Sequence, residues 1–243
     1  MDRTRAADSA HPRFQLRLLG RFELSCEGRA LRVSPSGERL LAYLGIRTEP
    51  AARPVVAAAL WPDCPDRRAA ANLRSTLWRL HERQPATPVR HRDGVVALAP
   101  TVTVDLTELS GQLDRSLNGE VSMAILRQDV LPDWPEEWLV PTREWFRQVR
   151  LRALENLSDH HRAAGRLDAA LAAGLAAVSC DPLRESAHRR LAQVHIAEGN
   201  FAEALRQYQS YRRLARTELG LPPSPQFRSL VGPLLGRPLD RPA

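Results

Sequence analysis

The sequence predicts a mainly α-helical protein with a small β component, in which a β-containing N-terminal domain precedes an all-α domain. Three observations lead to this fold class. Short β-prone runs gather within about the first hundred residues, helical periodicity covers most of the remainder, and two similar segments recur at an offset of 34 residues. A chain of 243 residues is long enough for two ordinary domains.

The N-terminal domain, expected over residues 13–105, begins with three short strands that are expected to form an antiparallel sheet. The candidates are FQLRLLG (14–20), RFELSC (21–26) and ALRV (30–33). A helix is expected over 36–46, with Ser34 or Ser36 as its cap, and a shorter helix over 53–61. Three strands followed by helices therefore open the chain.

A third helix, expected over 66–83 and capped by Asp63, carries most of the functional information. Its apolar stripe has the spacing of one helix face and consists of Ala70, Leu73, Leu77 and Leu80. The opposite side carries side chains that can reach phosphates and base edges, namely Arg68, Asn72, Ser75 and Arg79, with Arg74 on a flank. Two alternatives stay open: a solvated helix face, and an ion pair between Arg74 and an acidic core residue.

A basic hairpin is expected directly after this helix. Residues 89–98 form two β-prone runs around Asp93-Gly94, a strong signal for a two-residue turn, and 101–106 is expected to continue the unit. The first run carries the candidate phosphate-binding residues Arg90, His91 and Arg92, for which ordinary surface charge is the alternative. A helix for the major groove and a hairpin for the adjacent backbone together predict a winged helix-turn-helix.

Charge supports nucleic-acid binding by the N-terminal domain. The formal net charge is +7, and residues 1–100 account for all of it, with 17 arginines against 10 acidic residues. All 35 basic residues are arginine, which excludes P-loop, pyridoxal and protein-kinase chemistry because each needs a lysine. The pair His160-His161 lacks a third ligand at helical spacing, so neither a metal nor a cofactor is expected, and the chain is not expected to be an enzyme.

Cysteine usage and hydropathy indicate a soluble cytoplasmic protein. Cys26, Cys64 and Cys180 lie far apart without metal-ligand spacing, as expected for free thiols in a reducing compartment. No apolar run approaches the roughly 20 residues that cross a membrane, and no signal peptide is evident at the N-terminus. No membrane partner is therefore expected.

The second domain is expected over 106–230 as helical repeats. The segments 163–171 and 197–205 align at the period of tetratricopeptide helix pairs, with a glycine ending the first helix of each pair. Trp134, Trp138 and Trp145 are expected to anchor the first helices of this domain, with a partner-binding surface as the alternative. Core or edge packing is expected of Trp61 and Trp78, with base stacking as the alternative. The terminal segments 1–12 and 231–243 are expected to be disordered.

Several segments in a fixed order resemble the bacterial antibiotic-regulatory activators, in which an OmpR-type winged helix precedes a bacterial transcriptional activator domain. They are RLLGRFEL with the following EGRAL, GERLLAYLGI, LWPD, AANLRSTLWRL, DGVVAL with VDLTEL, LPDWPEEWL and TELGLPPSP. The resemblance spans about residues 14–230. It departs from the family pattern at His81, where arginine is common, and in a short linker before the hairpin.

The resemblance implies an activator that binds direct repeats in double-stranded DNA near promoters, often those of secondary-metabolite genes. It implies a homodimer or tandem protomers on DNA and recruitment of RNA polymerase. The alternative is a helical-repeat interaction module whose winged helix has lost specific DNA binding, for which His81 and the short linker are the motivation.

Overall fold

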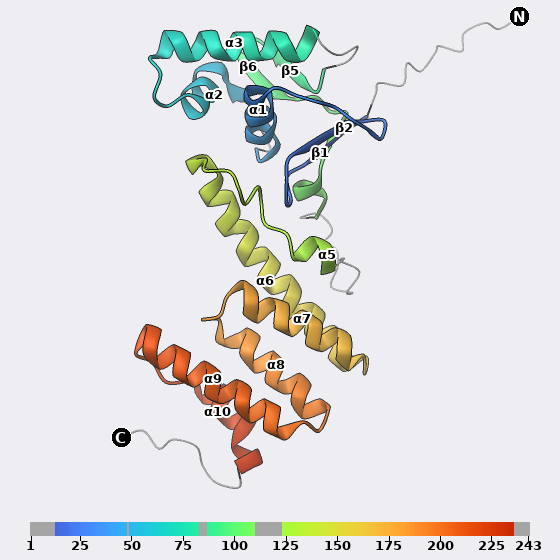
Figure 1. The fold of residues 1–243 in the computed structure, drawn as a ribbon, viewed down its shortest axis with the longest axis vertical. Helices are drawn as coiled ribbons and strands as arrows, with labels where there is room; N and C mark the ends of the chain where they lie inside the picture. The colour runs from blue at the N-terminus through green and yellow to red at the C-terminus, as the bar shows by residue number, and fades with distance from the viewer. Residues whose placement is uncertain (1–12, 48, 83–86, 110–122, 236–243) are drawn as a thin grey trace, which may run out of the picture. The chain divides into compact units, whose positions relative to one another are not determined.

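The computed structural model describes residues 13–47, 49–82, 87–109 and 123–235 (Figure 1). The expected arm over 1–12 and the end of the chain from residue 236 lie outside the described residues. The chain divides into two compact units. The first consists of Met1–Gln112 and Asp129–Arg143, and the second of Leu113–Gln128 and Glu144–Ala243.

The first unit begins with a four-stranded sheet of order β3-β2-β1-β7. Its strands are β1 (Phe14–Arg17), β2 (Glu23–Cys26), β3 (Arg29–Ala30) and β7 (Val102–Val104). The pairs β1–β2 and β2–β3 are antiparallel, as the sequence predicts, whereas β7 pairs in parallel with β1. Residues 101–106 belong to the first unit, and Asp105 accepts hydrogen bonds from the backbone N–H groups of Leu18 and Leu19 at 2.9 and 3.0 Å.

Three helices of the first unit pack on one another: α1 (Pro35–Gly45), α2 (Arg53–Leu60) and α3 (Asp66–Glu82). The hydroxyl of Ser34 accepts from the backbone N–H of Gly37 and caps α1, as predicted. The expected cap of α3, Asp63, is wrong. The carbonyl of Pro65 instead accepts from the backbone N–H groups of Arg68 and Ala69, so the helix begins at Asp66.

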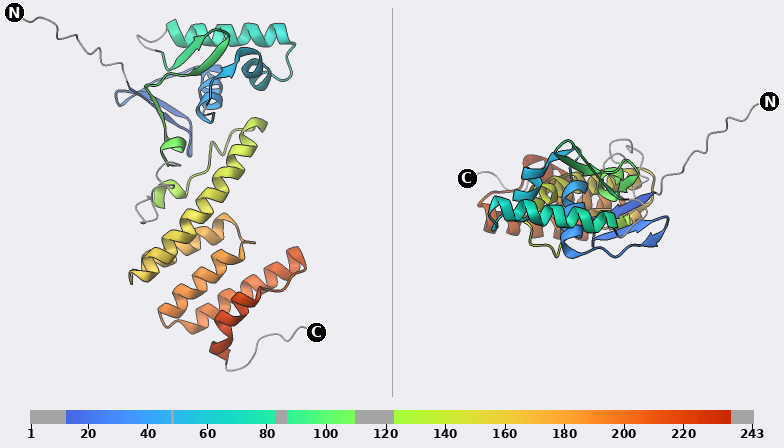
Figure 2. Two further views of the ribbon diagram at one scale, coloured as in Figure 1. Left: turned by 180° about the vertical axis from the view of Figure 1, so that it is seen from behind. Right: turned by 90° about the horizontal axis from the view of Figure 1, so that it is seen from above.

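A second sheet has the order β4-β6-β5, from β4 (Ala51–Ala52), β5 (Val89–Arg92) and β6 (Val95–Leu98). Strands β5 and β6 form the predicted hairpin. Asp93 and Gly94 both have positive φ, 51° and 79°, as a two-residue turn of type I′ requires. This hairpin lies alongside α3 in the first unit (Figure 2). Strand β4, which the sequence did not predict, pairs with β6 and directly precedes α2, so the hairpin lies next to the start of that helix.

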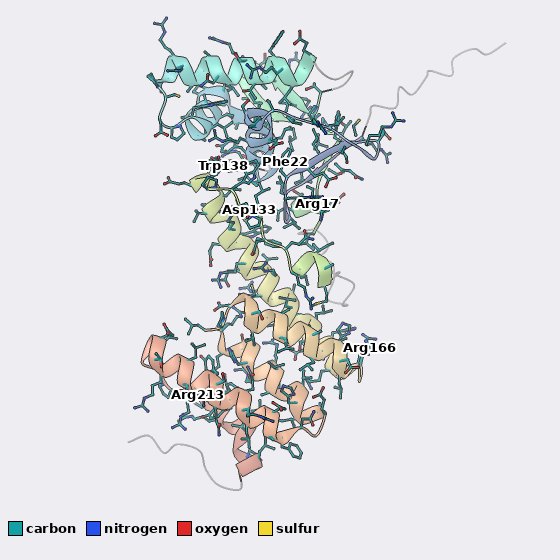
Figure 3. All side chains as sticks on the ribbon, viewed as in Figure 1. Arg17, Phe22, Asp133, Trp138, Arg166 and Arg213 are labelled. Carbon is teal, nitrogen blue, oxygen red and sulfur yellow. The ribbon has the colours of Figure 1, made fainter. Side chains whose placement is uncertain are left out.

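The segment Asp129–Arg143 packs within the first unit, although the sequence assigns it to the helical domain. Trp134 stacks on Phe22 at 6.0 Å between ring centroids, and Trp138 contacts Tyr43 edge-on at 5.3 Å (Figure 3). The prediction that these two tryptophans anchor the repeat helices is therefore wrong. Trp145 belongs to the second unit and is 43% exposed, so its anchoring role stays a prediction.

The second unit is helical. The helices are α5 (Met123–Leu126), α6 (Val140–Ala163), α7 (Leu167–Cys180), α8 (Glu185–Ala197), α9 (Phe201–Leu219) and α10 (Pro225–Val231). Helix α6 begins in the first unit, after the short 3-10 helix Glu137–Leu139. A second 3-10 helix, Gly232–Leu235, follows α10.

Helices α6–α7 and α8–α9 are the two helix pairs that the 34-residue offset predicts. Gly165 and Gly199 end the first helix of each pair with φ of 72° and 76°. Ala170 and Ala204, at equivalent positions, are both fully buried, since small side chains let the paired helices approach closely. The chain does not become irregular at residue 231: Val231 ends α10 and is buried in the core of the second unit.

Candidate nucleic-acid interface

Helix α3 of the first unit has one buried and one exposed face. Five residues pack into the core: Ala69, Leu73, Thr76, Leu77 and Leu80. The predicted stripe is wrong at Ala70, which is exposed. Thr76 enters the core instead because its hydroxyl donates to the carbonyl of Asn72 at 2.9 Å, which satisfies the buried polar group.

The opposite face carries the predicted DNA-binding side chains. Arg68, Arg74, Ser75 and Arg79 are exposed, and Asn72 is half-buried. Across the described ranges, none of the three arginines forms an ion pair, so the alternative role of Arg74 as a link to an acidic core residue finds no support. The guanidinium groups of this face are therefore available to an external ligand.

The hairpin of β5 and β6, residues 89–98, is called the wing below, and it is equally accessible. Arg90, His91 and Arg92 are exposed on β5, and Arg92 has only a loose contact with Asp93, 3.4 Å between Nε and Oδ2. His91 is the point where three elements meet. Its Nδ1 lies 3.1 Å from Nη2 of Arg53 at the start of α2, and its ring lies 6.0 Å from that of His81 at the end of α3.

The contact between His81 and His91 shows which side of α3 faces the wing. Residues seven apart lie almost on one line along a helix, so Arg67, Arg74 and His81 form one row. Since His81 ends this row beside His91, the row faces the wing. Arg68, Asn72 and Arg79 lie on the side of the exposed face farther from the wing. The face shared with the wing therefore centres on Arg74 and its neighbours.

The sequence pattern did not single out Arg53 or Arg67 of this surface, and it indicated a base-stacking role for Trp78 only as the alternative. Arg67 and Trp78 are exposed, and the expectation of core or edge packing for Trp78 is wrong, because 60% of it is exposed. The spacing of seven residues from Arg67 to Arg74 and from Arg74 to His81 could have identified Arg67, because residues seven apart lie on one side of a helix. No local pattern marks Arg53, because its partner His91 lies 38 positions away.

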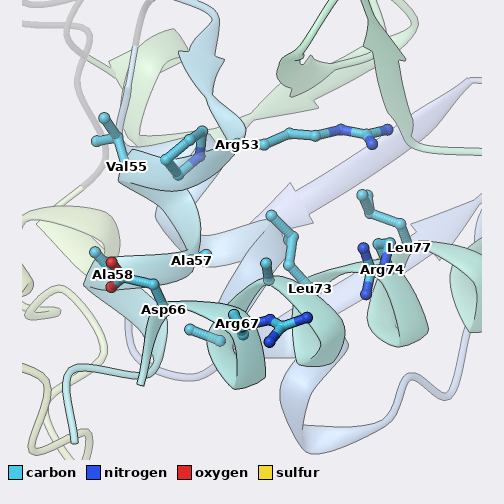
Figure 4. Close-up of a pocket in the computed structure, with 12 residues that line it drawn as sticks. Arg53, Val55, Ala57, Ala58, Asp66, Arg67, Leu73, Arg74 and Leu77 are labelled. Carbon is cyan, nitrogen blue, oxygen red and sulfur yellow. The ribbon is translucent and has the colours of Figure 1, made fainter. Parts of the chain in front are cut away.

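Residues of α2 and α3 line a groove of about 660 Å³ (Figure 4). Its floor is apolar, with Ala57, Leu73 and Leu77, and its lining includes Arg53, Arg67 and Arg74 together with Asp66. Three cations against one carboxylate favour an anionic ligand beside the groove. A sugar-phosphate strand fits this chemistry, because arginine pairs with phosphate oxygens through paired N–H donors.

The described residues lack the features of two other classes of site. They contain no group of three or more His, Cys, Asp or Glu side chains placed to bind a metal ion. Their helices include none with the length and apolarity that a membrane crossing demands.

Comparison with known proteins identifies one domain of the chain. Residues 115–235 match the family model of the bacterial transcriptional activator domain. Among solved structures, the chain is similar to Mycobacterium tuberculosis EmbR in complex with a low-affinity phosphopeptide, at 22% sequence identity and a TM-score of 0.77, over 95% of this chain and 67% of that one. No curated protein sequence matches the chain. Residues 115–235 therefore form a bacterial transcriptional activator domain, and the likeness to EmbR shows that the two chains share a fold.

Proposed function

We propose that this protein is a transcriptional activator that binds specific DNA sequences through α3 and the wing. The observation that carries the proposal is the arginine-bearing exposed face of α3 beside the basic hairpin β5–β6. An α-helix fits the major groove, where Arg74 and Arg79 can each donate two hydrogen bonds to guanine. Arg68, Asn72 and Ser75 supply further contacts to base edges and phosphates.

Phosphate contacts fix the position of the protein on the duplex. The wing residues Arg90, His91 and Arg92 lie where a neighbouring sugar-phosphate strand would pass, and Arg53 lies at the start of α2. The N-terminal end of a helix favours an anion, which adds to the charge of Arg53. The wing and α2 are therefore assigned to backbone contacts, and α3 to base contacts.

The remaining features of the proposal follow the family resemblance. Tandem protomers or a homodimer bind direct repeats near promoters, often those of secondary-metabolite genes, and the helical repeats of the second unit recruit RNA polymerase. The protein acts in the cytoplasm, where bacterial chromosomes lie. No cofactor enters this scheme, and the protein is proposed to act without catalysis.

Mobility shift with the full-length chain and upstream regions of neighbouring genes tests the proposal. Replacing Arg74 or Arg79 by Ala is expected to cost about 1–3 kcal/mol of binding free energy and to relax one position of the site. Arg213→Ala, which removes an exposed arginine of α9, is the matched control and is expected to leave affinity unchanged.

Absence of salt-dependent, sequence-selective binding would contradict the proposal and favour the interaction module. In that case, pull-down with a variant lacking Arg68, Asn72 and Arg79 would recover the same partners as the wild-type chain. An activator instead requires that the same variant fails to stimulate transcription from its promoter in a reconstituted assay.

A further inference from the structure

Trp78 occupies the middle of the exposed face of α3, between the row of Arg74 and the side that carries Ser75 and Arg79. It has 60% of its surface exposed, while its chain neighbour Leu77 is buried. Arg74 and Ser75 precede it by one helical turn, so their side chains flank the indole on the same face. An exposed aromatic ring between groups suited to DNA points to a ligand that has both polar and apolar features.

The major groove offers an apolar feature of this kind. The C5-methyl group of thymine is the apolar group among the base edges there, and it distinguishes thymine from cytosine and from the purines. We propose that Trp78 packs against the C5-methyl group of a thymine and selects a T·A pair at one position of the operator. This inference rests on the proposed function and names a specificity determinant for it.

Helix geometry places this thymine within the site. Trp78 lies four residues after Arg74, which is about 6 Å along the helix axis. Successive base pairs are about 3.4 Å apart, so the thymine lies at most about two base pairs from the position that Arg74 contacts. A guanine followed or preceded by thymine at this distance is therefore expected in the binding motif.

The test begins with selection of binding sites from random DNA by the full-length chain. The wild-type motif is expected to contain a thymine that becomes degenerate when Trp78→Ala is used. Each thymine of the selected site is then replaced by uracil, which lacks only the methyl group. One replacement is expected to weaken wild-type binding about three- to fivefold, as the loss of one buried methyl group implies, and to leave Trp78→Ala binding unchanged.

Trp145→Ala is the matched control, because it removes another exposed tryptophan and is expected to leave both motif and uracil response as in the wild type. The uracil series on wild-type protein needs no variant, so it remains decisive if Trp78→Ala folds poorly. A selected motif with no response to any uracil overturns the thymine contact alone. Failure to select any motif overturns the proposed function and the thymine contact with it.

Discussion

The guanidinium groups of Arg90 and Arg92 extend from the wing into solvent. The side chain of Arg92 is 90% exposed, and its contact with the equally exposed Asp93 is weak at such a site. Neither group would have to break a strong interaction before binding phosphate. Their contribution to DNA binding is therefore expected to be electrostatic and independent of sequence.

Replacing Arg90 or Arg92 by Ala should weaken binding to all sequences to a similar degree. Each lost phosphate contact should reduce the slope of log affinity against log salt by about 0.9, because one fewer counterion is released. Fluorescence anisotropy of labelled DNA over a salt series measures the slope, with Arg213→Ala as control. A changed motif at an unchanged slope would assign the residue to base contact instead.

Glu155 is the centre of a buried ion network in the second unit. Its carboxylate accepts from Nε of Arg184 at 2.7 Å and from the hydroxyl of Ser186, and Nη1 of Arg190 lies 3.4 Å away. Burial, the largest influence, raises the pKa of Glu155, but the hydrogen bonds and the two guanidinium charges together outweigh burial and lower the pKa below 4.5.

The lowered pKa of Glu155 predicts a loss of stability in acid. The ionised carboxylate stabilises the fold fully above the ordinary value of 4.5, and this contribution is lost as pH falls through the lowered folded-state pKa. Glu155→Gln should reduce the free energy of unfolding by about 1.5–3 kcal/mol at neutral pH. Urea unfolding at several pH values should show this difference shrinking in acid; a difference that stays constant with pH would contradict the assignment.

At the scale of elements, the side chain of one arginine forms hydrogen bonds with several backbone carbonyls of the segment Asp129–Arg143. Arg143, in the first turn of α6, donates to the carbonyls of Val130, Leu131 and Trp134. A bridge between Leu19 and Val130 joins this segment to the end of β1, and an ion pair between Arg39 and Glu136, 2.8 Å from Nε to Oε1, joins it to α1.

Arg143→Ala should loosen this segment without unfolding the sheet. Three half-buried carbonyls would lose a charged donor, at a cost of about 1–3 kcal/mol. Hydrogen exchange should speed up at the backbone amides of Leu131 and Trp134, with Arg152→Ala, at an exposed position of α6, as control. Unchanged exchange at these amides would show that apolar packing alone fixes the segment.

At the scale of the whole molecule, the compact units determine where the chain can be cut. The side chains of Val130, Leu131 and Leu139 are buried, and all three belong to the first unit. Each fully buried aliphatic side chain contributes about 1.5–3 kcal/mol. The first unit therefore includes core residues that lie inside the match to the activator domain family.

A fragment of residues 13–143 should unfold at a higher temperature than a fragment of residues 13–105, the boundary expected from sequence. The shorter fragment lacks the three aliphatic residues and exposes Phe22 and Tyr43, which Trp134 and Trp138 otherwise cover. Differential scanning calorimetry of both fragments measures the difference. Equal midpoints would show that the segment contributes nothing to the stability of the winged helix.

The sequence by itself determined the local elements and their order. Period-3.6 patterns located α1, α2 and α3, the Asp93-Gly94 turn located the wing, and the 34-residue offset located the repeats, because each signal lies within a short stretch of chain. The exposed DNA-facing candidates of α3 followed from the same periodicity.

Only the tertiary structure decided how distant stretches combine. The parallel pairing of β7 with β1, the contact of Arg53 with His91 and the packing of Trp134 and Trp138 in the first unit all join residues far apart in sequence. Such contacts produce no periodic pattern in the sequence. For the same reason periodicity defined the polar face of α3 but not the side of that face beside the wing, and it could not show that Trp78 faces solvent.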